Sequence, residues 1–384
     1  MMKKSKGGIE SAAVSPEASA EKRKMVRDTS TTGRVTMQDI AMLVGVSRIT
    51  VSKYFNGNQG IKADTRRRIE KACADLHYVP DPLAVSLVKG KSPLIGVVIP
   101  VISEPFFAEV LSVIEEEAAG LGLRVVILCS YNDPAREAAA LLALRAMKVH
   151  GVVFTPVASE DNVTLLSRLE QEMRILYLDS YLNSECHFVM NDNLQSTGLI
   201  TRYLLSRGHR PAFLAAPPVA NPSGPERIAG YLDAMQEAGA QPFLIPLSST
   251  GATWEFETFA MNHMLSFLGT GEWLKEKKTA LICATDRLAI GAMAAFRKFG
   301  LEPGRDVAIV GHDDLHVCEF LYPALTTVKQ DVTSIGRAVI EFFGLDESEV
   351  SADTPYFQRK FAARLVVRDS CLPTLNRTVR FPAK

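Results

Sequence analysis

A short stretch near the amino terminus carries side chains that could read DNA bases. Arg48 and Lys53 could donate hydrogen bonds to the O6 and N7 atoms of guanine, whereas Ile49 could only contact the methyl group of thymine. Hydroxyl and amide side chains nearby suit phosphate contacts, which position a protein on the duplex without reading its sequence: Ser47, Thr50 and Asn56. These residue types indicate recognition of nucleic acid through the major groove.

Two short helices joined by a tight turn would present these side chains together. Thr36 and Asp39 have the spacing of a capping box, so a helix should begin after Thr36. Gly45 favours a tight turn, and Ser47 can cap a second helix that runs to about Phe55. The sequence therefore predicts a helix-turn-helix, whose second helix enters the groove.

The second helix should turn one face inward. Val51 and Phe55 are four residues apart and share that inner face. The outer face is left to Arg48, Ile49, Ser52 and Lys53. A third helix, from about Ala63 to His77, would close the core with Ile69, Cys73 and Leu76. The alternative is a three-helix bundle that binds another protein and keeps its charges solvated.

The charge distribution favours the nucleic-acid interpretation. The 384 residues include 43 basic and 43 acidic side chains, so the whole chain has no net charge. Residues 1–91 nevertheless hold 17 Lys and Arg against 9 Asp and Glu, a surplus of eight positive charges, and the remaining residues carry the opposite surplus. One end of the chain is thus suited to a polyanion.

Composition limits the class of protein and its location. With 47% hydrophobic and 22% charged residues, the chain is neither disordered nor fibrous and is long enough for two to three domains. No apolar run approaches the ~20 residues of a membrane span, and the basic start lacks the apolar core of a signal peptide. The six cysteines are widely spaced, so we expect no disulfide, no metal and a cytoplasmic location at the bacterial nucleoid.

Beyond residue 93 apolar runs alternate with amphipathic segments. The apolar runs are 94–102, 125–129, 151–155, 175–178, 212–215, 280–284 and 307–310. The helical patterns cover 106–121, 135–147, 163–172, 194–207, 227–238 and 287–299. Near-continuous Val, Ile and Leu strands between helices are typical of parallel sheets covered on both faces. We expect an α/β fold with two lobes and a ligand site where the carboxyl ends of the strands meet.

Two enzyme-like motifs occur in the sequence, and neither has the structural context that its chemistry needs. His312 and His316 have the spacing of a zinc-binding pair with Cys318 nearby, but the pair needs a helix and here follows a strand through Gly311. Residues 90–92 imitate the end of a phosphate loop without its first glycine or a preceding strand. Neither a nucleophile elbow nor a dinucleotide fingerprint occurs. We expect no enzyme activity and no cofactor.

The runs Val35-Thr-Met-Gln-Asp-Ile-Ala, Gly45-Val-Ser-Arg-Ile-Thr-Val-Ser-Lys and Leu76-His-Tyr-Val-Pro80 resemble the LacI-type (lactose-repressor and ribose-repressor) family of bacterial transcriptional regulators. The resemblance continues over residues 35–370, including Arg227-Ile-Ala-Gly-Tyr231 and Leu325-Thr-Thr-Val-Lys-Gln330. It implies an amino-terminal helix-turn-helix domain followed by a two-lobed α/β domain with parallel sheets, similar to type I periplasmic binding proteins.

Composition and the resemblance together give a domain plan, in which the tail over 1–34 follows from its polar composition without apolar periodicity. Residues 1–34 would form a flexible basic tail, 35–80 the DNA-binding domain, 81–92 a hinge helix and linker, 93–370 the effector-binding and dimerisation domain, and 371–384 a tail. The lobes would be joined by crossings near residues 190, 325 and 358. Leu87 would insert into the minor groove at the operator centre, where an apolar wedge kinks the duplex. The alternative is that Leu87 packs on its own lobe. Thr36 is also expected to contact DNA.

Family motifs place candidate effector contacts in the two lobes. They fall on Glu104, Phe106, Phe107, Asp179, Thr285, Asp313 and Gln330. Departures from sugar-binding relatives put Glu104 where Asn is common, and Ser180 and Pro225 where Arg is common. We expect little positive charge at this site, and therefore a neutral sugar, polyol or nucleoside rather than an anionic sugar.

These features together predict a homodimeric, ligand-responsive regulator, most often a repressor in this family, that binds pseudo-palindromic double-stranded operator DNA. Dimers are favoured because the last residues contain Pro373 and Pro382 and lack the heptads of tetramerising relatives. The alternative function is a solute-binding protein of a sugar uptake system, which the two lobes alone would equally support.

Overall fold

The computed structural model describes residues 35–55, 60–79, 92–157, 160–181, 183, 185–215, 222–247, 255–345 and 356–371. Two predicted DNA contacts, Asn56 and Leu87, lie outside these residues, as do the tails over 1–34 and 372–384 and nearly all of the expected hinge. The chain divides into two compact units, Met1–Ser92 and Pro93–Lys384. No helix of the described residues is long and apolar enough to cross a membrane.

The first unit contains α2 (Met37–Val44), α3 (Arg48–Phe55) and α4 (Ala63–Asp75). Thr36 and Asp39 form the complete capping box that the sequence predicts before α2. Gly45 ends α2 with φ near +72°, a left-handed conformation that glycine adopts without strain. The α4 helix ends at Asp75, two residues earlier than expected, because His77 takes a left-handed conformation that a continuing helix cannot accommodate.

A small apolar core holds these three helices together. It contains Ile40, Ala41, Val44, Val51, Ile69, Ala72 and Leu76, with the half-buried Phe55 and Cys73 packed against it. Two polar contacts add to the packing of α4, since the Tyr54 hydroxyl donates to Glu70 at 3.2 Å and the Arg68 guanidinium donates to the carbonyl of Val44. The apolar core, which α2 and α4 share with α3, therefore sets the direction in which the outer face of α3 points.

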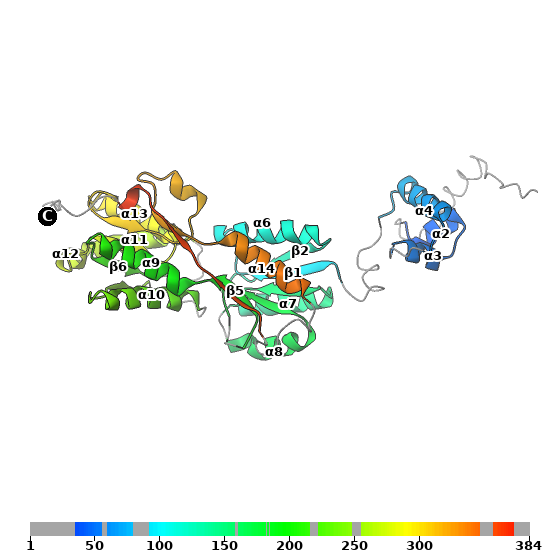
Figure 1. The fold of residues 1–384 in the computed structure, drawn as a ribbon, viewed down its shortest axis with the longest axis horizontal. Helices are drawn as coiled ribbons and strands as arrows, with labels where there is room; N and C mark the ends of the chain where they lie inside the picture. Colours follow the sequence, from blue (N-terminus) through cyan, green and yellow to red (C-terminus); the bar gives the residue numbers. More distant parts are fainter. Residues whose placement is uncertain are drawn as a thin grey trace, which may run out of the picture. The chain divides into compact units, whose positions relative to one another are not determined.

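The second unit begins with a lobe built on a six-stranded parallel sheet, called the first lobe here. Its strand order is β11-β5-β4-β3-β1-β2, and Figure 1 labels β1, β2 and β5 in this lobe. The strands are β1 (Leu94–Ile99), β2 (Arg124–Cys129), β3 (Gly151–Phe154), β4 (Ile175–Leu178), β5 (Phe188–Asn191) and β11 (Gln358–Phe361). The expected apolar run over 94–102 is a strand only to Ile99, because Pro100 follows and has no amide hydrogen for the ladder.

Helices cover both faces of this sheet. Alternate residues of β1 point to opposite faces, so Val97 lies in a core with α6 (Pro105–Gly120) and α14 (Val332–Gly344), whereas Val98 lies in a core with α7 (Pro134–Ala146) and α8 (Val163–Glu172). Burial on both sides explains why these strands are continuous apolar runs in the sequence.

The second lobe contains a four-stranded parallel sheet of order β7-β6-β8-β9. The strands are β6 (Pro211–Leu214), β7 (Leu244–Ile245), β8 (Ala280–Cys283) and β9 (Ala308–Val310). The helices α9 (Asn193–Ser206) and α10 (Ser223–Glu237) form one pair, and α11 (Phe256–Gly269) and α13 (Asp286–Lys298) form another, with the short α12 (Glu272–Lys275) after α11 (Figure 1). One apolar cluster joins the sheet to these helices.

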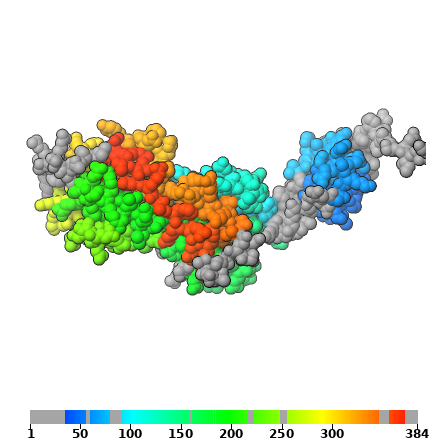
Figure 2. All heavy atoms as spheres, in the orientation of Figure 1, coloured from blue at the N-terminus to red at the C-terminus, as the bar shows by residue number. Residues whose placement is uncertain are grey.

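The chain passes between the lobes three times in the described residues. It leaves the first lobe from β5 into α9, returns from β10 (Thr327–Lys329) into α14, and leaves again from β11 into β12 (Arg364–Val366). β10 and β12 pair antiparallel, and the last described segment, red in Figure 2, lies over both lobes. The residues that follow the strand ends of both sheets therefore meet at the boundary between the lobes.

Candidate DNA-binding surface and effector site

The outer face of α3 is open to solvent. Arg48, Ile49 and Lys53 are exposed, and Ile49 is 69% exposed although it is a large apolar residue. Val51, on the opposite face, is fully buried in the core, so the helix cannot rotate this surface inward. The apolar Ile49 is suited to contact the methyl group of a thymine, and the basic Arg48 and Lys53 are suited to bond the edge of a neighbouring guanine.

Two of the hydroxyl side chains expected to contact DNA, Ser47 and Thr36, also cap helices. The Ser47 hydroxyl accepts the amide of Thr50 at 3.1 Å and lies 2.9 Å from the Thr50 hydroxyl. The Thr36 hydroxyl donates to the Asp39 carboxylate at 2.7 Å, and the Thr36 amide donates to the same oxygen at 2.8 Å. Ser52 is half-buried. The caps hold the amino-terminal ends of α2 and α3 in place, and a DNA contact from the Thr36 hydroxyl would compete with Asp39.

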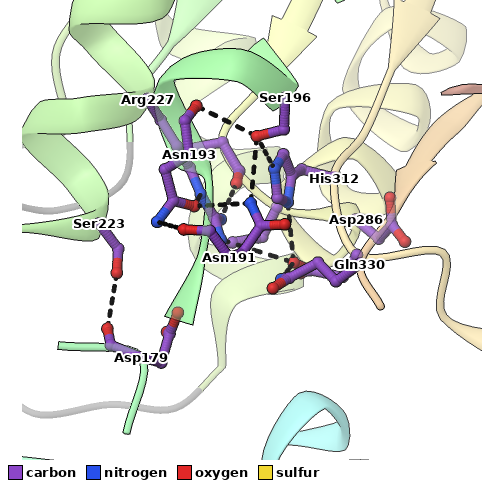
Figure 3. A network of polar contacts seen from close by, with 12 residues as sticks. Asp179, Asn191, Asn193, Ser196, Ser223, Arg227, Asp286, His312 and Gln330 are labelled. Atoms are coloured by element: carbon purple, nitrogen blue, oxygen red, sulfur yellow. Dashed lines mark hydrogen bonds and ion pairs between the residues drawn. The ribbon is translucent and has the colours of Figure 1, made fainter. Parts of the chain in front are cut away.

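A buried polar network occupies the boundary between the lobes (Figure 3). Arg227 of α10 donates from Nε to Oδ1 of Asn193 at 2.9 Å and from Nη1 to the carbonyl of Ala284 at 2.6 Å. Its Nη2 lies 3.8 Å from Asp313, and both side chains are less than one-tenth exposed. Asn191 donates to Asn193 and to Ser196 at 3.3 and 3.2 Å. The network thus ties the β5 crossing to α10 and to the ends of β8 and β9.

His312 continues this network into the second lobe. Its Nδ1 lies 3.0 Å from Asp313, and its Nε2 lies 2.8 Å from the Ser196 hydroxyl. Burial and the nearby Arg227 lower the pKa of His312 to about 4, so the ring is neutral at physiological pH. Because a carboxylate only accepts, Nδ1 carries the proton. Nε2 is then an acceptor facing the Ser196 hydroxyl, which also contacts the carbonyl of Asn193 at 3.1 Å. His312 and His316 do not share a helix, and the described residues contain no group of three metal-binding side chains.

Among the described residues, several buried polar atoms near the boundary have no hydrogen-bond partner, and three of them are acceptors of the polar network or of predicted effector residues. They are Oδ1 of Asp179, Oδ1 of Asn191 and Oε1 of Gln330. Gln330 is oriented by its amide, which donates to Asp313 at 2.7 Å, so its oxygen faces away from that bond. A buried acceptor without a partner costs free energy, which a bound molecule rich in donors would recover.

The backbone is strained at two of the predicted effector residues. Asp179 has φ near +52° and Asp313 has φ near +127°, both in the left-handed half of conformational space that side chains disfavour. Each follows the carboxyl end of a strand, β4 and β9 respectively. The strain is consistent with a functional placement of the two carboxylates.

Burial raises the pKa of Asp179 to about 7. The nearby Arg227 acts in the opposite direction, whereas the carboxylates of Asp313 and Glu226 raise the value further. The carbonyl of Asp179 accepts from the Ser223 hydroxyl of α10 at 2.8 Å (Figure 3). Asp179 therefore lies where both lobes meet and resists ionisation.

The other predicted effector residues differ in accessibility. The rings of Phe106 and Phe107 pack edge to face within the core of the first lobe, with their centroids 5.4 Å apart. The two side chains are 7% and 6% exposed, respectively. Most of each ring is therefore occupied by the core. The Thr285 hydroxyl accepts the amide of Leu288 at 3.2 Å as the cap of α13.

The expected charge of the site is corrected by the structure. Glu104, which the sequence places near other carboxylates with little positive charge, forms an ion pair at 2.9 Å with Arg287 of α13. The buried Arg227 supplies a second guanidinium beside Asp313. Two arginines therefore lie beside the carboxylates at the boundary, and the sequence reasoning missed both because they lie far along the chain from the groups they meet.

Asp286 is a further functional candidate that the sequence reasoning did not select. Its carboxylate accepts from the Thr327 hydroxyl at 2.5 Å and from the amide of Leu315 at 2.8 Å. Burial raises its pKa to about 7, with the Asp313 carboxylate as the next cause. A Cβ atom at Gly311 would lie 2.0 Å from Oδ1 of Asp286, so a larger residue there would have to displace this hydrogen-bonded carboxylate. The Thr285-Asp286 pair after an apolar strand was the available signal.

Known proteins match both units. The family described as bacterial regulatory proteins, lacI family, matches residues 36–81, and the family of periplasmic binding proteins and the sugar binding domain of LacI family matches residues 92–355. The HTH-type transcriptional repressor PurR of Edwardsiella ictaluri (strain 93-146) is 30% identical over 314 residues, covering 80% of this chain and 88% of the relative. The lactose operon repressor of Escherichia coli (strain K12) is 28% identical over 310 residues, covering 80% and 83%.

Solved structures agree with these matches. The Lac repressor dimer bound to operator and the anti-inducer ONPF superimposes with a TM-score of 0.77 at 26% identity, over 88% of this chain and all of that one. The architecture described above, a helix-turn-helix followed by two parallel α/β lobes, is thus the architecture of that repressor. The chain belongs to the LacI family of bacterial regulatory proteins.

Proposed function

We propose that the protein is a dimeric repressor that binds a pseudo-palindromic operator and responds to a small donor-rich effector. The observation that carries the proposal is the outer face of α3, where exposed Arg48, Ile49 and Lys53 are fixed in place by the buried Val51. Basic groups of this kind bond guanine, and phosphate contacts from the helix caps would set the register. The relatives named above are repressors, and the proposed role requires no catalysis and no cofactor.

Dimerisation is supported by an exposed apolar surface in the second lobe. Val317, Phe320 and Tyr322 lie in and just after the short 3-10 helix His316–Glu319, and their exposed fractions are 45%, 70% and 87%. Adjacent exposed apolar side chains favour association. A homodimer would also place two helix-turn-helix units on one operator, which multiplies affinity and specificity. The Lac repressor structure is a dimer on its operator.

The unpartnered acceptors support a neutral sugar, polyol or nucleoside as the effector. Asp179, Asn191 and Gln330 each offer a buried oxygen that needs a donor, and hydroxyl groups are donors. Arg227 is occupied by protein partners, so it is not free to bind a phosphate. These contacts support a charge-neutral effector class, although the site contains more positive charge than the sequence suggested.

Selection of random DNA duplexes on the purified protein at ~150 mM salt tests the DNA-binding proposal, because salt suppresses the non-specific electrostatic component. We expect enrichment of a two-fold symmetric site, and we expect Arg48→Ala to reduce its affinity by about 5- to 150-fold. Binding that ignores sequence, both with and without added cell metabolites, would contradict the proposal.

The alternative of a solute-binding protein for sugar uptake is not favoured. The match over residues 36–81 is to bacterial regulatory proteins, and α2 and α3 have the caps and turn of a helix-turn-helix. A role in uptake would leave this unit without a function. A regulator acts where the chromosome is, so we place the protein in the cytoplasm.

A further inference from the structure

Arg287 of α13 is held rigidly by its own lobe. Its Nε and Nη2 atoms donate to the two carboxylate oxygens of Glu257 in α11 at 2.7 and 2.8 Å. The guanidinium also lies 5.0 Å from the ring of Phe256. A bidentate pair fixes the plane of the guanidinium, so the direction in which Nη1 points is set before any contact with the first lobe forms.

Nη1 of Arg287 reaches across the boundary to the first lobe. It donates to Oε2 of Glu104 at 2.9 Å, and both side chains are only 14% exposed. Glu104 precedes α6 at its N-cap position, but its side chain makes no capping bond to that helix. The Glu104 carboxylate is therefore available to accept its hydrogen bond from Arg287 of the second lobe. Burial raises the pKa of Glu104, and the bond from Arg287 opposes that rise.

Separation of the lobes would leave neither partner as a buried unpaired charge. Arg287 would keep both bonds to Glu257, which lies on its own lobe. Glu104 would be exposed to water at the start of α6, where the helix dipole favours a negative charge. The contact can therefore break and re-form, unlike an ion pair whose loss strands a charge in the core.

We propose that Arg287 and Glu104 form a latch that closes the two lobes on the side of α6 and α13, and so sets the closed fraction of the protein before any effector binds. This inference builds on the proposed function, in which lobe closure couples the effector to DNA. A separate set of cross-lobe bonds uses α10, where Glu226 accepts from Tyr181 at 3.1 Å and from Lys360 at 2.6 Å. The latch therefore restrains opening of the lobes on the α6 and α13 side of the boundary, in addition to the bonds on the α10 side.

Distances between spin labels at Thr164 of α8 and Lys275 of α12 test the latch directly. Both positions are exposed and lie on different lobes, and labels on unnatural amino acids avoid the native cysteines. We expect Glu104→Gln and Arg287→Met each to raise the ratio of open to closed protein by about five- to tenfold in the full-length chain without DNA or effector. The double variant should open no further than either single variant.

Arg337→Met provides the matched control, because Arg337 pairs with Glu117 at 2.8 Å within the first lobe. It should leave the distances unchanged. Unchanged distances in Glu104→Gln and Arg287→Met, with near-ultraviolet circular dichroism showing intact packing, would overturn the latch. Since the measurement involves neither operator nor effector, this result would leave the proposed DNA binding standing, and a failure of DNA binding would leave the latch standing.

Discussion

Replacing Asp179 with Asn should stabilise the protein at high pH and leave its stability nearly unchanged at low pH. Asp179 is kept largely protonated up to about pH 7 because burial opposes its charge, and its Oδ1 atom has no partner. An amide has the shape of the protonated carboxyl group but cannot ionise. The variant therefore avoids the cost of a buried negative charge.

The magnitude follows from the two pKa values. The pKa of about 7 in the folded protein exceeds the ordinary value of 3.8 by roughly three pH units, and each unit corresponds to 1.36 kcal/mol. As pH rises from 3.8 to 7 the unfolded chain loses this proton and the folded protein keeps it, so the free energy of unfolding falls by up to about 4 kcal/mol. Below pH 3.8 Asp179 is protonated in both the folded and the unfolded state, so its ionisation no longer lowers the free energy of unfolding.

Urea unfolding of the wild type and Asp179→Asn, followed by far-ultraviolet circular dichroism from pH 4 to pH 8.5, measures the difference. We expect the variant to be more stable by up to about 4 kcal/mol at pH 8 and equal to the wild type near pH 4. Asp233→Asn, at an exposed position of α10, is the control and should show no such trend. Parallel stability curves for the wild type and Asp179→Asn would refute the reasoning.

Three further substitutions test other parts of the account. Leu87→Ala should weaken binding to the selected operator while leaving binding to random DNA nearly unchanged, and equal losses in a filter-binding assay would exclude the wedge role. Gly311→Ala should lower the urea midpoint by the equivalent of about 1–3 kcal/mol, because a Cβ atom would overlap Asp286; an unchanged midpoint would show that the contact relaxes freely. Phe320→Asp combined with Tyr322→Asp should shift the mass measured by light scattering from dimer to monomer, and a persistent dimer would rule out this surface.

Local signals made the elements predictable. Thr36 with Asp39, and Ser47 before α3, identify helix starts because a capping side chain acts within three residues. The helix over 163–172 and the strand over 175–178 coincide with α8 and β4, since periodicity and length are unambiguous there. The segment that forms α14 was not predicted, although its apolar face packs against α6.

The site was less predictable because its contacts are distant in sequence. Glu104 and Arg287 are 183 residues apart, and Ser196 and His312 are 116 residues apart. Only the topology of the two sheets brings such groups to one boundary, so the ordinary residue types Asn, Ser and Arg carried no signal of their own. Family motifs selected Asp179, Asp313 and Gln330, and these three remain proposed effector contacts.

We propose that an effector bound between the lobes changes the affinity of the protein for DNA. Calorimetry first identifies which neutral pentoses, hexoses, polyols and nucleosides bind the purified protein. Fluorescence anisotropy then measures the Kd for the selected operator with and without a saturating amount of each binder. We predict a change of about 5- to 150-fold in either direction, absent in Asp179→Ala. An operator Kd that stays the same with every binder would contradict the account.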